Sequence, residues 1–295
     1  MVTVWYRGKA KINSLLGKMP PEACTADEST NRLPYEIVEM ITAHIIHDLD
    51  ALKTCSLICR SWYIAAVPHI HHTLVLRENG PGTTRNELKP LSKLHELGLI
   101  PLVKEIRVKQ GYGTRHWFTP QAFGRRDLRY FSAFTNVQTL KLSRLEIYRF
   151  IPDIKRYFGH FAPTLRSIIL SQPWCTPRQL SHFLTLFSNL KSITVAGFVA
   201  HTPKTTNADT DLVPLSAPKL RERLALYHPC PVEVLTQLIT SCGGLWFRHI
   251  SLHGATGCAH ILLEACAETL ETLRFYPLDS PFSKEFSMGL PTDSS

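Results

Sequence analysis

A four-residue unit, in which the second and fourth residues are apolar, constrains the fold of this chain most strongly. The unit occurs eight times, and its first apolar positions are separated by 23 to 34 residues. Alternation with a period of two is typical of a β-strand that buries one face. The sequence therefore predicts eight short strands, at 73–76, 105–108, 139–142, 167–170, 192–195, 223–226, 249–252 and 272–275.

Six of the eight units have a further apolar residue three places before the first apolar position. These residues are Val103, Val137, Leu165, Leu190, Phe247 and Leu270. The resulting L-x-x-L-x-L pattern is the strand signature of leucine-rich repeats. The Asn or Cys that normally follows the strand is mostly absent and the spacing varies, so we expect an irregular arrangement.

Apolar residues at helical spacing lie between several of these strands, at 154–161, 180–187, 234–239 and 261–266. Thr176 is suited to cap the second of these helices, with Pro177 at its first position. Short strands alternating with helices predict an α/β fold with a parallel sheet, built as a solenoid. Two insertions interrupt the pattern, at 111–126 and at 201–219.

Residues 33–62 have a different pattern, because their apolar residues recur at helical spacing over two or three short helices. Pro34 suits the first turn of a helix, and Asp48 or Asp50 can cap the next one. We expect Pro68 to end the last helix. This segment is too small to bury all of its apolar residues, and surplus apolar surface on a small helical module is typical of a docking site for another protein.

The order Leu33-Pro34 with Glu36, then the isoleucine ladder, then Cys-Ser-Leu-Ile-Cys-Arg-Ser-Trp resembles an F-box. The resemblance is closest to F-box proteins of basidiomycete fungi in which leucine-rich repeats follow the F-box. It implies a substrate-recognition subunit of a cullin–RING ubiquitin ligase, with the adaptor subunit and the cullin as partners. The residues that match the adaptor-binding motif are Leu33, Pro34, Ile37, Val38, Ile41, Leu52, Ile58, Cys59 and Trp62. The sequence does not separate those that face an adaptor from those that hold the module together.

These patterns divide the chain into four predicted parts. Residues 1–30 form an N-terminal segment without clear periodicity, and 31–72 form the F-box-like helical module. Residues 73–280 form the leucine-rich-repeat-like solenoid, and 281–295 form a C-terminal tail. The resemblance implies no catalytic residue, because ubiquitin chemistry belongs to other subunits of such a ligase.

The formal net charge is +9, which favours acidic partners. On the strand positions that point away from the predicted core, five cations accompany a single anion, Glu105. We therefore expect this face to bind an acidic or phosphorylated segment of an unknown target protein, since arginine pairs well with carboxylate and phosphate. The predicted target-binding residues are Arg107, Lys109, Lys141, Arg223 and Arg274.

The residues do not indicate an enzyme or a cofactor. The chain has no G-x-S-x-G, H-E-x-x-H, phosphate-loop or dinucleotide-binding motif. It has eight cysteines, none of them in a C-x-x-C pair, so we expect reduced core thiols and no metal site. Without a signal peptide or a long apolar run, we expect a cytoplasmic or nuclear protein and no membrane partner.

Two alternatives remain open. One is a repeat-based scaffold that binds proteins without attachment to a ligase. The other is a nucleic-acid-binding protein that uses the basic and aromatic insertion at 111–126, including Arg125 and Arg126, together with Lys141. We do not expect a nucleic-acid partner, because aromatic residues in such a loop commonly pack onto the fold.

Overall fold

The computed structural model describes residues 33–77, 89–110, 118, 130–200, 221–227, 230–242, 244–254 and 259–277. The chain divides into two compact units, one ending at Ile70 and the other beginning at His71. We call them the helical unit and the sheet unit. Apart from Phe118, the insertion at 111–126 lies outside the described residues, as do the insertion at 201–219 and the predicted segments 1–30 and 281–295.

The helical unit contains α2 (Tyr35–His44), α3 (Leu49–Cys55) and α4 (Arg60–Ile70), and α4 packs against both of the other helices. The carbonyl oxygen of Pro34 accepts bonds from the N–H groups of Ile37 and Val38, at 3.0 and 3.2 Å. Helix α2 therefore begins where the proline predicts. The Asp48 carboxylate caps α3 by accepting bonds from two backbone N–H groups, at 3.1 and 2.9 Å.

The prediction that Pro68 ends the last helix is wrong by two residues. Helix α4 contains Pro68 and continues to Ile70. A proline lacks the N–H that would bond to the residue four places earlier, which makes it costly in the middle of a helix. In the last turn only one such bond is lost, so α4 tolerates it.

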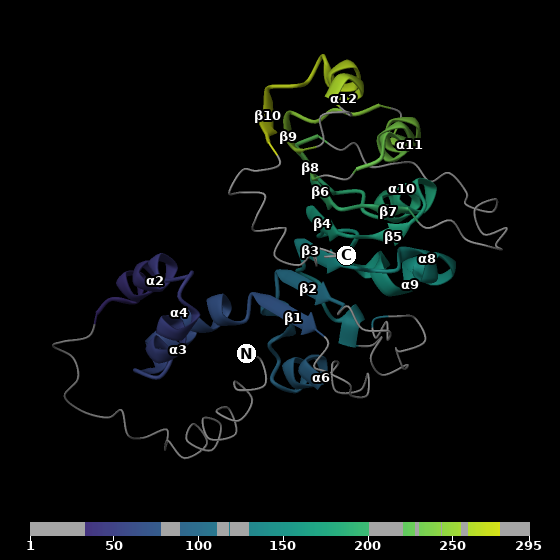
Figure 1. Ribbon diagram of the computed structural model, residues 1–295. Coiled ribbons are helices and arrows are strands. Elements are labelled where there is room, and N and C mark those ends of the chain that lie inside the picture. Colours follow the sequence, from purple (N-terminus) through teal and green to yellow (C-terminus); the bar gives the residue numbers. More distant parts are fainter. Residues whose placement is uncertain are drawn as a thin grey trace, which may run out of the picture. The chain divides into compact units, whose positions relative to one another are not determined.

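The sheet unit is built on one eight-stranded parallel sheet, as the eight repeated units predict (Figure 1). Its strand order is β1-β2-β3-β4-β6-β8-β9-β10, which is also the order of these strands along the chain. The strands are β1 (Thr73–Arg77), β2 (Glu105–Lys109), β3 (Thr139–Ser143), β4 (Ser167–Ser171), β6 (Ser192–Ala196), β8 (Arg223–Tyr227), β9 (His249–His253) and β10 (Thr272–Tyr276).

Equivalent positions of the repeated units pair with one another across the sheet. Leu74 pairs with Ile106, and Ile106 pairs with Leu140. The same register continues to Leu273 of the last strand. Because side chains alternate along a strand, two rows of apolar residues run across one face of the sheet. We call the opposite face, which carries the first, third and fifth residue of each strand, the open face.

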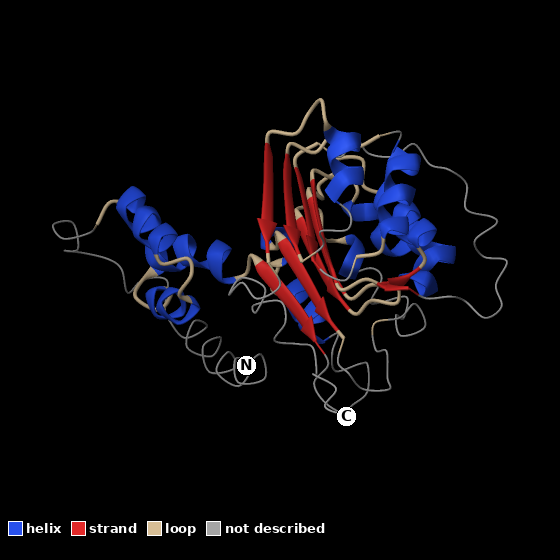
Figure 2. Cartoon of the chain, turned by 45° about the horizontal axis from the view of Figure 1, so that its top comes forward, coloured by secondary structure: helices blue, strands red, loops and turns tan. Residues whose placement is uncertain are grey.

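Helices α8 to α12 lie on one face of the sheet, and in Figure 2 they stand to one side of the red strands. Four of the described helical regions match the predicted ones: α9 (Ile154–Phe158) with η4 (Gly159–Phe161), α10 (Pro177–Thr185), α11 (Val232–Cys242) and α12 (Ala259–Cys266). The sequence patterns did not predict α6 (Lys89–Glu96), η1 (Ile100–Leu102), α8 (Ile147–Phe150), η3 (Ile151–Asp153), or the small sheet of β5 (Trp174–Cys175) and β7 (Val199–Ala200).

The predicted cap of α10 is present and is stronger than expected. The Thr176 hydroxyl accepts a bond from the Gln179 N–H, and the Gln179 side chain accepts one from the Thr176 N–H, at 3.2 and 3.0 Å. This reciprocal arrangement is a capping box. It fixes the point at which the chain leaves the small sheet and enters the helix.

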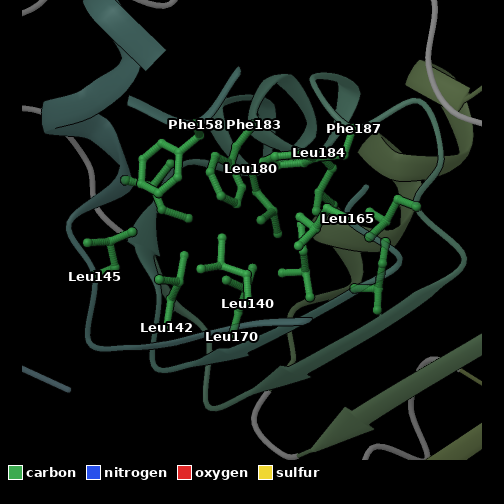
Figure 3. Close-up of a cluster of buried hydrophobic side chains, with 14 of the residues drawn as sticks. Leu140, Leu142, Leu145, Phe158, Leu165, Leu170, Leu180, Phe183, Leu184 and Phe187 are labelled. Carbon is green, nitrogen blue, oxygen red and sulfur yellow. The ribbon is translucent and has the colours of Figure 1, made fainter. Parts of the chain in front are cut away.

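The core lies between the helices and the sheet (Figure 3). Phe183 packs edge-on against Phe158 and Phe187, with ring centroids 5.3 Å apart in both pairs. These rings meet the leucines of the strands, such as Leu142 and Leu170, which are almost completely buried. Phe118, from the predicted basic insertion, is buried in the same core. Edge-to-face aromatic contacts of this kind add to the stabilisation from burial alone.

Four strands, β3, β4, β6 and β9, are each followed directly by a residue with positive φ. These residues are Arg144 (φ 59°), Gln172 (φ 52°), Gly197 (φ 62°) and Gly254 (φ 68°). The Arg144 N–H donates to the Ser171 carbonyl at 2.7 Å, so pairing continues one residue beyond the strand before the chain turns away. The left-handed conformation is natural for glycine, but it costs roughly 1 kcal/mol for Arg144 and Gln172.

Asparagine links neighbouring repeats before the strand rather than after it. The Asn136 side chain donates to the Pro101 carbonyl, and the Asn189 side chain donates to the Pro163 carbonyl, both at 2.8 Å. Each of these asparagines lies four places before the first apolar residue of a strand. The asparagines thus join a strand entrance to the turn of the preceding repeat.

Candidate functional site

The helical unit leaves most of its large apolar side chains on the surface. Among the described residues, fifteen large apolar side chains are exposed, and ten of them lie between residues 33 and 64. We call these ten the apolar patch: Leu33, Tyr35, Ile37, Met40, Ile41, Leu49, Leu57, Ile58, Tyr63 and Ile64. The buried apolar residues of this unit are few and mostly small: Val38, Leu52, Ala65, Ala66 and Val67.

The structure divides the nine residues of the predicted adaptor-binding motif into two groups. Leu33, Ile37, Ile41 and Ile58 belong to the apolar patch, Pro34 and Cys59 are also exposed, and Trp62 is half-buried. Val38 and Leu52 are different, because only 1% and 0% of these residues is exposed. Their assignment to a contact surface is corrected: they hold the three helices together.

The motif omits part of the exposed surface that the structure describes. Leu57 is 62% exposed and Met40 is 59% exposed, and Tyr63 and Ile64 are also on the surface. Leu57 and Ile58 lie in the turn between α3 and α4. Two adjacent large apolar residues could have predicted part of this exposed surface from the sequence. Neighbouring residues of a helix point in different directions, so a single buried face can take only one of them.

The open face of the sheet separates the five predicted target-binding cations into two groups. Arg107, Lys109 and Lys141 lie on β2 and β3, whereas Arg223 and Arg274 lie on β8 and β10. The intervening strands, β4 and β6, carry no charged residue on their open face. At about 4.8 Å per strand, β3 and β8 are roughly 14 Å apart.

Two cations of the first group, Arg107 and Lys141, form ion pairs with Glu105. The Arg107 and Lys141 side chains each lie 2.8 Å from the same oxygen, Oε1 of Glu105. Burial opposes ionisation of this carboxyl, but the hydrogen bonds and charges of the two cations outweigh it and hold the pKa of Glu105 below its ordinary value. At this end of the open face, Glu105 therefore partly neutralises the charge of Arg107 and Lys141.

The second group lines a pocket of about 270 Å³ on the open face, which we call the arginine pocket. Arg223 and Arg274 are both exposed, and neither forms an ion pair with a described residue. The residues that line the pocket are Arg223, His249, Ile250, Ser251, Thr272 and Arg274. The sequence predicted these arginines, but not that they share a pocket.

Three stacked rings lie at the ends of the same three strands, β8, β9 and β10. His253 lies between Tyr227 and Tyr276, with centroid distances of 3.9 and 4.3 Å and interplanar angles of 10° and 9°. His253 is only 8% exposed, and its Nδ1 has no hydrogen-bond partner. Burial first, and then the charge of Arg223, lower the pKa of His253. The imidazole is therefore neutral at physiological pH and stacks as an aromatic ring.

The remaining chemistry-bearing side chains are dispersed. In the described parts of the chain, no three His, Cys, Asp or Glu side chains come together in a way that could hold a metal ion. Cys175 and Cys266 are buried free thiols whose pKa values are raised by burial, while Cys59 is exposed, which corrects its expected place in the core. Arg125 and Arg126 lie outside the described residues.

Among the described helices, none is both long and apolar enough to cross a lipid bilayer.

No known protein-family model matches this chain, and a search of curated proteins finds no match to it.

Proposed function

We propose that this protein is the substrate-recognition subunit of a cullin–RING ubiquitin ligase. In this proposal the helical unit is an F-box that binds the adaptor subunit, and the sheet unit is a leucine-rich-repeat solenoid that binds a target protein. The observation that carries the proposal is the apolar patch. The strict sequence order of the parallel strands supports the solenoid, because each repeat then contacts only its neighbours.

The energetics of the apolar patch favour a permanent partner. Burying apolar surface contributes about 25 cal/mol per Å², so covering even a few of these side chains is worth several kcal/mol. A standard protein interface buries roughly 1,600 Å² in total, and in this proposal the adaptor covers exposed residues such as Ile37, Leu57 and Ile58. Val38 and Leu52 would then act indirectly, by fixing the helices that present these residues.

The mechanism of such a subunit is positioning. It holds a target close to the ubiquitin-transfer machinery, so that a bimolecular step becomes effectively local. The chain contributes no catalytic residue and needs no cofactor in this proposal. It would act in the cytoplasm or the nucleus, where such ligases assemble, and the open face would hold an acidic or phosphorylated segment of the target.

The adaptor interface can be tested by co-purification of the tagged full chain with the adaptor and cullin. The variant Ile37→Ser/Ile58→Ser should lose at least tenfold of the recovered adaptor, because both side chains belong to the apolar patch. The matched control is Leu263→Ser, which changes an exposed leucine of α12 in the sheet unit and should leave recovery unchanged. Circular dichroism shows whether each variant is folded.

Undiminished adaptor recovery by a folded Ile37→Ser/Ile58→Ser variant would reject the proposal. A chain that captures other proteins through its sheet unit but never recovers an adaptor would instead be a scaffold without ligase attachment.

A further inference from the structure

The last three strands arrange nine open-face side chains in three rows. The parallel register pairs His249 with Arg223 on one side and with Thr272 on the other, and these three residues form the first row. The second row, one pleat further along, contains Ala225, Ser251 and Arg274. The third row is the stack of Tyr227, His253 and Tyr276.

The arginine pocket has room for a ligand because Ser251, a small residue, lies among longer side chains. Ser251 lines the pocket and is only 4% exposed. The longer side chains of Arg223, His249 and Arg274 also line it. The stack of Tyr227, His253 and Tyr276 lies one row beyond Ser251 and Arg274 on the same strands.

The charge of this block differs from that at the other end of the open face. Arg107 and Lys141 share the carboxylate of Glu105, whereas Arg223 and Arg274 have no anionic partner among the described residues. None of the nine positions in the block is acidic. An anion would therefore gain more here than beside Glu105.

We infer that the arginine pocket binds a phosphate monoester, with Arg223 and Arg274 as its two cationic contacts. The two arginines lie on strands two steps apart, about 10 Å in backbone separation, and on different rows. Both side chains line the pocket, so both guanidinium groups are available to a single ligand. A tetrahedral group with three terminal oxygens can accept bonds from both arginines and still face a hydroxyl of Ser251 or Thr272.

A carboxylate fits this arrangement less well. It is planar and has two oxygens, which the fork of a single arginine already satisfies. Its single negative charge also leaves one of the two arginines uncompensated. A phosphate monoester carries about −1.5 to −2 charge at neutral pH, which matches the pair.

The phosphate monoester has two potential sources, a phosphorylated side chain of a protein segment and a small phosphorylated compound. The first source rests on the proposed function, because it makes the pocket the anchor for a target. The second does not. Both use the same contacts, so the site can be tested before its natural source is known.

Binding is measured with the full chain and three probes: phenyl phosphate, a degenerate peptide library with a central phosphoserine, and the same library with glutamate in its place. We expect phenyl phosphate and the phosphoserine library to bind, and the glutamate library to bind at least tenfold more weakly. Tighter binding of the phosphoserine library than of phenyl phosphate assigns the site to a protein segment. Equal binding assigns it to a small phosphorylated compound.

The variant Arg223→Ala/Arg274→Ala should weaken phenyl phosphate binding at least tenfold. The matched control, Lys155→Ala/Arg156→Ala, removes the same charge from exposed positions of α9, outside the open face, and should change binding less than twofold. The variant Arg223→Lys/Arg274→Lys keeps the charge but removes the forks, so we expect an intermediate loss. Since all of the replaced side chains are exposed and form no ion pair with a described residue, every variant should remain folded, as circular dichroism would verify.

Absence of phenyl phosphate binding to the folded wild-type chain would overturn the inference. Equal losses in the two double-alanine variants would do the same, because binding would then follow net charge rather than this pocket. Equal affinity for the glutamate and phosphoserine libraries would show a carboxylate site. Adaptor recovery, measured on the same Arg223→Ala/Arg274→Ala variant, should stay at the wild-type level, so failure of this inference is distinguishable from failure of the ligase proposal.

Discussion

The two units of this protein handle their apolar residues in opposite ways. The sheet unit encloses a continuous core of leucines, isoleucines and phenylalanines, with Phe183 and Leu170 completely buried. The helical unit, although rich in apolar residues, encloses few of them and exposes ten large ones. The difference shows that large apolar side chains can form a closed core in one region of a chain and remain exposed to solvent in another.

The largest expected effect tests the sheet unit. Replacing Phe183 with alanine should lower the free energy of unfolding by about 3–5 kcal/mol, because the ring is fully buried between Phe158 and Phe187 and a cavity remains. Urea denaturation followed by fluorescence measures this loss. Val232→Ala, at an exposed position of α11, should cost less than about 0.5 kcal/mol. Similar losses from both changes would mean that the core is not packed as described.

Lowering the pH should also destabilise the sheet unit. Burial lowers the pKa of His160 from 6.5 to about 4. Between these values the unfolded chain binds a proton that the folded chain excludes, so stability is retained above about pH 6.5 and falls as the pH is lowered. From pH 7 to about pH 5 we expect a loss of roughly 2 kcal/mol.

Denaturation curves at several pH values measure the pH dependence that His160 causes. The His160→Gln variant, which cannot titrate in this range, should lose correspondingly less stability between pH 7 and about pH 5. Equal slopes for the wild-type chain and the variant would show that His160 is not the group responsible.

A smaller effect compares two glycines of the sheet unit that have the same backbone conformation. Gly98 has φ +64° and open space around it, whereas a Cβ on Gly197, at φ +62°, would lie 3.1 Å from Cγ of Gln172. Gly98→Ala should cost about 1 kcal/mol from backbone strain alone. Gly197→Ala should cost more, up to about 2 kcal/mol, because the neighbouring side chain must also move. Thermal unfolding measures both, and an equal cost would contradict the close packing of Gln172 against this turn.

The smallest expected effect on stability belongs to the helical unit. The variant Leu57→Ser/Ile58→Ser should change the free energy of unfolding by less than about 0.5 kcal/mol, because both side chains are already in water. Urea denaturation measures this change. A large loss of stability would show that these residues belong to a core, and the contrast between the two units would then fail.

The eight strands could be predicted because each has two apolar residues at a period of two. The strands also recur at intervals of 23 to 34 residues, which leave room for a helix and its connections. The cap at Thr176 could be predicted because the capping residue directly precedes the helix. For the second helix of the helical unit the sequence left Asp48 and Asp50 as alternatives, and the structure shows that Asp48 is the cap. Helix α8 was missed because four residues are too few to show a helical period. Arg144 and Gln172 were missed because neither is a residue type that normally signals positive φ.

The composition of the apolar patch and of the arginine pocket could not be predicted from the spacing of residues along the chain. In α2, apolar residues lie on more than one side, so the spacing of Ile37, Val38 and Ile41 does not show which side faces inward. The stack of Tyr227, His253 and Tyr276 depends on the pairing of three strands. The same pairing brings Arg223 and Arg274 to one pocket. In the same way, the pairing of β2 with β3 places Glu105 within reach of Lys141.

The strict order of the strands has a consequence for how the sheet assembles. Paired residues of neighbouring strands are never far apart along the chain: the interval ranges from 23 residues, between Ile250 and Leu273, to 34, between Ile106 and Leu140. The entropic cost of closing a loop grows only slowly with its length, so each new strand joins at nearly the same cost. Every strand therefore finds its predecessor already synthesised, and the sheet can grow in step with translation without waiting for a distant partner.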